Sequence, residues 1–154
     1  MDEPRLEPVP GRLPAPLRDY AEKFNAREYM AAAHHEEMVV VWNRVQSHLY
    51  RGLMILAAAF VHLERGNSEG ARIKFRKARD QLLSLRPHYL GVDVAQIVER
   101  IDQALTALEG VARGEPNLLA LVPPFSIHLD LRRVRGDEVE WQEILEPQSR
   151  QEES

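Results

Sequence analysis

The chain contains no cysteine among its 154 residues. This absence excludes disulfide bonds, thiolate zinc sites and a cysteine nucleophile, and it is typical of proteins from a reducing compartment. The longest uncharged apolar run, Gly52 to Leu63, is shorter than the roughly 20 residues that span a bilayer. No basic stretch followed by an apolar stretch opens the chain, so a secretory signal is not expected. We therefore expect a cytoplasmic protein that makes no membrane contact.

An excess of positive charge is also missing. Lysine and arginine number 20 against 24 aspartate and glutamate, which gives a net charge of −4. Because dedicated nucleic-acid-binding domains are usually strongly basic, this balance argues against that class. The length fits one domain, and a chain of this size buries roughly 68–70% of its unfolded surface. Its core is therefore expected to need no disulfide or metal.

What the sequence does have is helical periodicity. Pro16 suits the first position of a helix, and apolar residues follow at helical spacing: Leu17, Tyr20, Ala21 and Phe24. Asn25 is expected to cap a second helix over about 26–47. A third helix over about 50–65 is nearly all apolar, so we expect it to occupy the centre of the fold.

A fourth helix is predicted to extend to about Arg86, where Pro87 stops it. Gly66 suits the left-handed position that follows the third helix, and Asn67 or Ser68 caps the fourth. The stripe of the fourth helix that is expected to be buried consists of Ala71, Phe75, Ala78, Leu82 and Leu85.

A fifth helix is predicted from the capping residue Asp93 to about Ala112. Its inward-facing residues are expected to be Val94, Ile97, Ile101, Leu105 and Leu108. The five helices between residues 16 and 112 predict an all-α fold, a five-helix antiparallel bundle with short loops.

Both ends of the chain depart from this pattern. Prolines punctuate residues 1–15 and predict an extended or disordered N-terminal arm. In the C-terminal extension, residues 113–145, apolar and polar residues alternate on either side of Gly136-Asp137, which predicts a β-hairpin. The alternating residues are Phe125, Ile127, Leu129, Leu131, Val139 and Trp141. The polar residues 146–154 are expected to form a loose tail.

Three stretches carry a resemblance to a known family: Arg51 to Asn67, Gly70-Ala71, and Tyr89 to Val94. At these places the family reads Gly-Leu-Ile-Gln-x-Ala, Arg-Gly-Asn-x-x-Gly-Ala and Gly-x-Asp-Val. Over about Phe24 to Leu108 the chain resembles the bacterial, archaeal and plastid family catalogued as domain of unknown function 309. The resemblance implies an all-α bundle and no particular reaction, because that family is uncharacterised. The matching motif residues are Gly52, Gly66, Asn67, Gly70 and Asp93.

The first half of the family pattern is only partly present. The family has a His-Glu pair before a tryptophan, with a second carboxylate between them. His35-Glu36 and Trp42 keep the spacing, whereas Val39 stands where the second carboxylate is expected. Two extra residues also separate Glu28 from His35, which on a continuous helix rotates one relative to the other by about 200°. Few groups for catalysis are therefore left.

The run from His34 to Glu37 is the densest group of potential metal ligands. Adjacent residues of a helix point about 100° apart, so these four cannot converge on one ion without a group from another helix. His62 on the apolar third helix is the natural candidate, and aromatic residues with a polar end can line the same space. The predicted small polar pocket consists of His35, Glu36, Trp42, Tyr50 and His62.

Structural interpretations of the same residues stand beside this one. His35 and Glu36 can form buried hydrogen bonds that fix helix packing, and Trp42 can be part of the core. Asn67 and Asp93 lie where helix caps belong, and capping alone explains them.

These patterns favour a non-catalytic binding or interaction module without a cofactor or metal, although they do not decide whether the protein is an enzyme. Its partner is expected to be a protein or a small molecule, and self-association stays open. The alternative is a metal-dependent hydrolase that uses His35, Glu36 and His62, with Glu36 as the base. A third hypothesis is nucleic-acid contact through the basic side of the fourth helix, for which a solvated face is the simpler interpretation. The basic residues are Arg72, Lys74, Arg76, Lys77 and Arg79.

Overall fold

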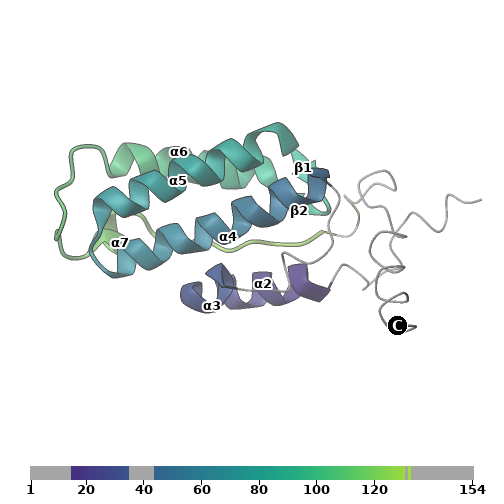
Figure 1. The fold of residues 1–154 in the computed structure, drawn as a ribbon, viewed down its shortest axis with the longest axis horizontal. Coiled ribbons are helices and arrows are strands. Elements are labelled where there is room, and N and C mark those ends of the chain that lie inside the picture. The colour runs from purple at the N-terminus through teal and green to yellow at the C-terminus, as the bar shows by residue number, and fades with distance from the viewer. Residues whose placement is uncertain (1–14, 35–43, 131, 133–154) are drawn as a thin grey trace, which may run out of the picture.

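The computed structural model describes residues 15–34, 44–130 and 132, and these residues are mostly helical, as predicted (Figure 1). Two short strands form one small antiparallel sheet. The elements are α2 (Ala15–Asn25), α3 (Tyr29–Ala33), α4 (Arg44–Glu64), α5 (Ser68–Leu82), the 3-10 turn η2 (Leu83–Leu85), β1 (His88–Tyr89), β2 (Val92–Asp93), α6 (Val94–Ala107) and α7 (Leu118–Leu121). The predicted N-terminal arm and C-terminal tail lie outside the described residues.

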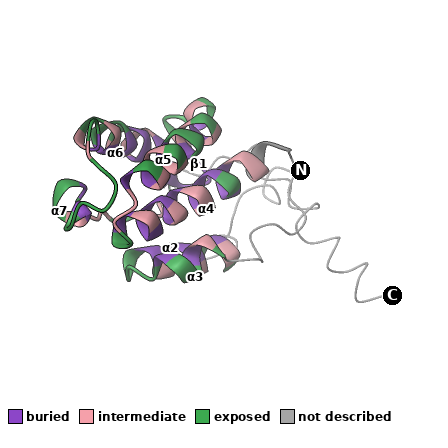
Figure 2. Cartoon of the chain, turned by 60° about the vertical axis from the view of Figure 1, so that its left-hand side comes forward, coloured by how far each residue is buried: buried purple, intermediate pink, exposed green. Residues whose placement is uncertain are grey.

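Helix α4 occupies the centre of the fold. In Figure 1 it lies between α5 and α6 on one side and α2 and α3 on the other. Its core stripe repeats at intervals of three and four residues, and every member is fully buried: Leu49, Leu53, Leu56 and Phe60. Figure 2 shows buried residues repeating along this helix. The prediction that the apolar helix is central is therefore confirmed.

The predicted boundary between the second and third helices is wrong. Instead of one helix over 26–47 and another over 50–65, the structure has the short α3 and then α4 from Arg44. Residues 44–51 contain no glycine or proline that would end a helix. Helix α4 therefore continues through residues 47–50, where the second and third helices were expected to be separated. Residues 35–43, between α3 and α4, lie outside the described residues.

Asn25 is not the cap of the second helix. It is the last residue of α2, and α3 begins only after a turn in which Arg27 has φ +64°. The Asn25 side chain instead forms two hydrogen bonds with the backbone of Ile127. Its Nδ2 donates to the Ile127 carbonyl at 2.8 Å, and the Ile127 amide donates to its Oδ1 at 2.7 Å. Asn25 thus holds a segment that follows it by about a hundred residues.

That segment, residues 123–130, is extended and runs along the bundle between α2 and α4 (Figure 1). Phe125 contacts the rings of Phe24 and Phe60 edge-on, with centroids 5.6 and 5.9 Å away, and Ile127 is buried. Leu129 forms an isolated antiparallel bridge with Val92. The predicted hairpin partner, including Gly136-Asp137, lies outside the described residues, so that hairpin stays a prediction.

The hairpin that the described residues do contain was not predicted. Strands β1 and β2 pair His88 with Asp93 and Tyr89 with Val92. The two residues of the turn, Leu90 and Gly91, have φ +51° and +78°. Two-residue turns of this kind usually carry asparagine or aspartate at the first position. Leu90 is instead fully buried, and its burial offsets the strain of a left-handed leucine.

Helices α5 and α6 carry the predicted core stripes but end earlier than expected. All five predicted stripe residues of the fourth helix are buried, although α5 gives way to the 3-10 turn after Leu82. Helix α6 ends at Ala107 rather than near Ala112, and Gly110 with φ +75° turns the chain. Of the five residues expected to face inward on α6, Leu105 is only half-buried.

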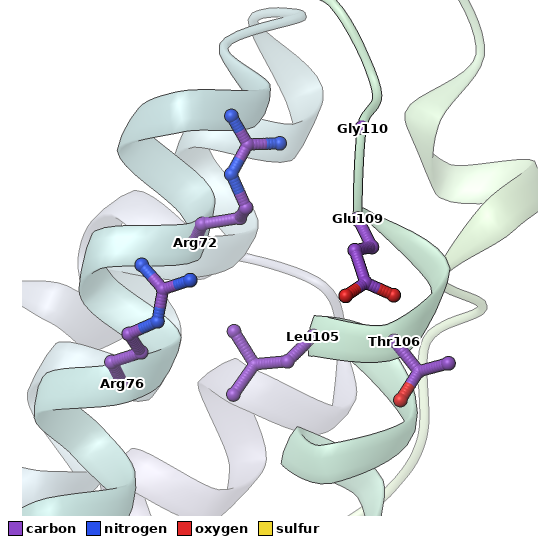
Figure 3. A pocket seen from close by; sticks show the side chains of 6 residues that line it. All are labelled: Arg72, Arg76, Leu105, Thr106, Glu109 and Gly110. Carbon is purple, nitrogen blue, oxygen red and sulfur yellow. The ribbon is translucent and has the colours of Figure 1, made fainter.

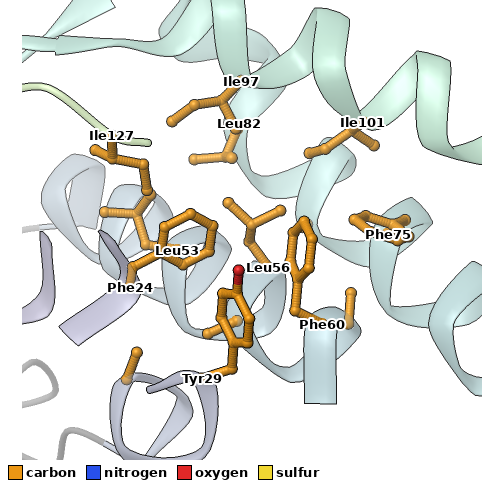
Figure 4. Close-up of a cluster of buried hydrophobic side chains, with 14 of the residues drawn as sticks. Phe24, Tyr29, Leu53, Leu56, Phe60, Phe75, Leu82, Ile97, Ile101 and Ile127 are labelled. Atoms are coloured by element: carbon orange, nitrogen blue, oxygen red, sulfur yellow. The ribbon is translucent and has the colours of Figure 1, made fainter. Parts of the chain in front are cut away.

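The core is continuous across these helices and rich in aromatic rings. Figure 4 shows side chains of α2, α3, α4, α5 and α6 converging around Leu56 and Phe60. The Phe60 ring stacks on Tyr29 with centroids 4.8 Å apart and meets Phe75 edge-on at 5.6 Å. Close packing of α4 on α5 also needs a glycine, because a Cβ on Gly52 would lie 2.6 Å from the Leu82 side chain.

Candidate functional site

A groove of about 370 Å³ lies between α5 and the end of α6 (Figure 3). Residues four apart on a helix share a face, so Arg72 and Arg76 line one wall. The opposite wall comes from the last turn of α6 and the residues after it. These residues are Leu105, Thr106, Glu109 and Gly110. In Figure 3 the Leu105 side chain points into the groove, and Glu109 lies on the wall opposite the two arginines.

Arg72 has a structural role, because its side chain donates hydrogen bonds to the backbone at the end of α6. Its Nη1 donates to the Leu108 carbonyl at 2.7 Å and to the Val111 carbonyl at 3.1 Å. The buried Ser68 hydroxyl donates to the same Val111 carbonyl at 3.0 Å. The last carbonyls of a helix have no partner within the helix and carry partial negative charge, so a cation there is stabilising. Arg72 and Ser68 therefore join the start of α5 to the end of α6.

Arg76 differs from its neighbours on the same face. Arg79, one turn further on, pairs with Asp102 at 2.6 Å. Within the described ranges, no hydrogen bond or ion pair joins the exposed Arg76 to another residue, and none closes the gap to Glu109. In this groove the guanidinium of Arg76, which has no partner among the described residues, and the carboxylate of Glu109 therefore lie on opposite walls. The sequence places Arg72, Arg76 and Arg79 on one basic face. In the structure Arg72 and Arg79 have partners, whereas Arg76 has none among the described residues.

The structure describes only two of the five residues of the predicted polar pocket, Tyr50 and His62. His35, Glu36 and Trp42 lie outside the described residues, so the pocket around them stays a prediction. Tyr50 and His62 both lie on α4, twelve residues apart, which places them about 18 Å apart along the helix axis. The structure does not bring these two together. Tyr50 is buried near the start of α4, and that burial raises the pKa of its hydroxyl.

His62 lies at the other end of α4, against the turn into α5. Its Nδ1 is 3.1 Å from Asn67 Nδ2, and Asn67 Oδ1 accepts from the Gly70 amide at 2.9 Å. Because the Asn67 amide group is oriented by this cap, its nitrogen faces His62 and donates. His62 Nδ1 must then accept, which makes it the unprotonated nitrogen of a neutral ring. Gly70 makes this contact fit, since a Cβ there would lie 2.6 Å from His62 Nδ1.

The surroundings of His62 also favour its neutral form. Burial lowers its pKa first, and the positive charges of Lys74, Arg65 and Arg113 lower it further. A neighbourhood of cations that repels a proton also repels a divalent metal ion. This electrostatic arrangement disfavours the predicted hydrolase in which His62 joins His35 and Glu36 as a metal ligand.

This environment gives a pH prediction. We expect His62 to titrate below its ordinary pKa of 6.5, as followed by the chemical shift of its ring protons in NMR. The unfolded chain then binds more protons than the folded protein between the two pKa values. Unfolding free energy should therefore fall as the pH is lowered through 6.5 toward the folded-state pKa, and should not depend on His62 well above pH 6.5.

The substitution Lys74→Gln tests whether the charge of Lys74 contributes to the lowered pKa of His62. Removing this charge should move the His62 pKa upward, whereas Lys77→Gln, an equal charge change at an exposed site of α5, should leave it unmoved. A His62 pKa at or above 6.5 in the unmodified protein would contradict the assignment.

The motif residues have structural roles where the structure describes them. Gly66 has φ +71° after the end of α4, Asn67 caps α5, and Asp93 Oδ1 accepts from the Gln96 amide at 3.1 Å to cap α6. These three roles match the predictions. The contacts at Gly52 and Gly70 show two further positions where a side chain would collide with a neighbour.

Sequence reasoning missed the α6 wall of the groove. Leu105 was assigned to the core, and Thr106 and Glu109 were not considered. Their spacing on one helical face was visible in the sequence, but nothing in it shows that α6 ends beside Arg76.

Comparison with known proteins gives one match. The family model described as Domain of unknown function (DUF309) matches residues 17–73, which include α2, α3, α4 and the first part of α5. This match to residues 17–73 supports the resemblance noted in the sequence. No curated protein and no solved structure matches the chain.

Two further findings concern the described part of the chain. No helix there combines the length and apolar character needed to cross a membrane. Nor do three histidine, aspartate or glutamate side chains in those ranges gather closely enough to hold a metal ion.

Proposed function

We propose that the protein is a non-catalytic binding module and that the α5–α6 groove binds a small zwitterion of the amino-acid type. The observation that carries this proposal is Arg76, whose guanidinium has no partner among the described residues and lines the groove opposite the wall that holds Glu109. A volume of about 370 Å³ lies within the usual range for small-molecule sites.

The chemistry of the groove supports this ligand class. The planar guanidinium of Arg76 offers N–H donors in a fork that matches a carboxylate. Glu109 on the opposite wall offers an acceptor for an ammonium group, and Leu105 supplies an apolar contact between them. The six lining residues include one carboxylate and no histidine, so they lack the acid and base pair that most hydrolytic reactions need. Binding is thus the simpler use of this site.

The scaffold around this groove is proposed to be the predicted five-helix bundle in a cytoplasmic protein. Among the described residues from 15 to 107, five α-helices, α2 to α6, follow one another, with α4 in the middle. The polar pocket around His35 and Glu36 would be a separate feature of the same bundle. A protein partner is the alternative occupant of the α5–α6 groove, through one acidic and one basic side chain on its surface.

The test compares L-alanine with L-lactate, in which a hydroxyl replaces the ammonium group. In a titration followed by amide chemical shifts, alanine should produce saturable shifts at Arg72–Arg76 and Leu105–Gly110. Arg76→Gln should weaken alanine binding about tenfold, which corresponds to losing roughly 1.4 kcal/mol. Glu109→Gln should remove the preference for alanine over lactate.

Lys77→Gln is the matched control, because it makes the same charge change at the next residue of α5 outside the groove. It should leave alanine binding within twofold of the unmodified protein. Equal weakening by Arg76→Gln and Lys77→Gln, or no saturable shift with either probe, would contradict the proposed site.

A further inference from the structure

A second cavity, of about 150 Å³, lies where α4, α5 and α6 meet the segment that follows α7. Two of its walls are the rings of Phe60 and Phe75, which are fully buried, and a third is the ring of Phe125. Leu121 on α7, which is 43% exposed, lines the side that faces solvent. The cavity is therefore apolar where the three rings line it and polar where Arg100 and Gln103 line it.

The one charged residue that lines this cavity is Arg100, on α6. Its guanidinium carbon lies 5.5 Å from the centroid of the Phe125 ring, an arrangement in which the ring attracts the cation. Arg100 is half-buried, and it forms no hydrogen bond or ion pair with any residue in the described ranges. Because the Phe125 ring occupies the face of the guanidinium, the N–H donors along its edge stay available.

We propose that this cavity binds a small carboxylic acid with an aromatic or short branched apolar group. The apolar group enters between Phe60, Phe75 and Phe125, and the carboxylate pairs with the edge of Arg100. A volume of about 150 Å³ has room for a single benzene-sized ring. A carboxylate accepts two parallel N–H bonds from a guanidinium, which fixes its orientation as well as its charge. This site is separate from the α5–α6 groove and does not rest on the function proposed there.

A purely structural role for Arg100, holding Phe125 on α6, makes different predictions. We therefore choose 4-fluorobenzoate and 4-fluorobenzyl alcohol as probes, which share the ring and differ in the charged group. The full chain is titrated with each probe, and binding is followed by the fluorine NMR line width. We expect saturable binding of the benzoate, at least about tenfold tighter than that of the alcohol.

Two variants separate the parts of the site. Arg100→Gln should weaken benzoate binding about tenfold and leave alcohol binding unchanged, while Arg51→Gln, an equal charge change at an exposed site of α4, should alter neither. Ala104→Leu adds atoms to the cavity wall and should abolish binding of both probes. The helical circular dichroism of each variant shows whether it is folded.

The proposal is overturned if benzoate does not bind, if the alcohol binds as tightly as benzoate, or if Arg100→Gln leaves the benzoate affinity unchanged. Arg76→Gln, which removes the charge of the other site, should leave benzoate binding intact. The two proposals therefore fail or succeed separately.

Discussion

Leu56→Asp is expected to cost about 4 kcal/mol or more in unfolding free energy. Leu56 lies in the middle of α4, is fully buried, and is surrounded by the apolar side chains seen in Figure 4. An aspartate there would place a carboxylate in the core without a partner, where neither its charge nor its hydrogen-bonding capacity is satisfied. Since domains of this size are usually stable by only about 5–15 kcal/mol, a large loss of folded protein should follow.

Ile73→Asp is the matched control for this substitution. It makes the same kind of change on the neighbouring helix α5, at a side chain that is 44% exposed. Its effect should stay within roughly 0.5 kcal/mol. Denaturant unfolding followed by circular dichroism measures both variants. If Leu56→Asp unfolds at nearly the denaturant concentration of Ile73→Asp, the central position of α4 is wrong.

Phe60→Ala is expected to cost about 3–5 kcal/mol, since it removes a large buried ring and leaves a cavity. The Phe60 ring lies at the centre of the aromatic cluster, in contact with the rings of Phe24, Tyr29, Phe75 and Phe125. These partners come from α2, α3, α5 and the C-terminal segment. Losing Phe60 therefore loosens four parts of the fold at once.

Two comparisons separate this effect from simple loss of apolar surface. Phe60→Leu keeps part of the buried volume and should cost clearly less than the alanine variant. Leu121→Ala removes an apolar side chain that is 43% exposed and should cost much less. Equal midpoints of thermal unfolding for Phe60→Ala and Leu121→Ala would contradict the central role of the aromatic cluster.

The helices whose core stripes repeat regularly were predictable from the sequence. Leu17, Tyr20, Ala21 and Phe24 on α2 are all buried, as their spacing indicates, because only one face of a helix can meet the core. The first residues of α5 and α6 were predictable, because a capping side chain decides locally where each helix begins. Asn67 and Asp93 each accept a hydrogen bond from the residue three positions ahead, which depends on nothing distant.

Contacts between distant parts of the chain were not predictable in this way. Asn25 looks like a cap from its neighbours, yet its side chain bonds to Ile127, about a hundred residues later. The same holds for the candidate sites. Nothing near Arg76 in the sequence shows that Glu109 lines the opposite wall of its groove, and nothing near Arg100 shows that the Phe125 ring lies against it.

The sequence by itself determined that this protein is mostly helical, that residues 17–73 resemble a known family, that the apolar helix is central, and where two helices are capped. Those properties follow from local spacing and local hydrogen bonds, which the chain encodes within a few residues. Only the tertiary structure decided that α4 begins at Arg44, that residues 123–130 close one side of the bundle, and which arginines have no partner among the described residues. These depend on which surfaces meet in the packed state, where a polar group gains or loses its partner according to residues far away in the chain.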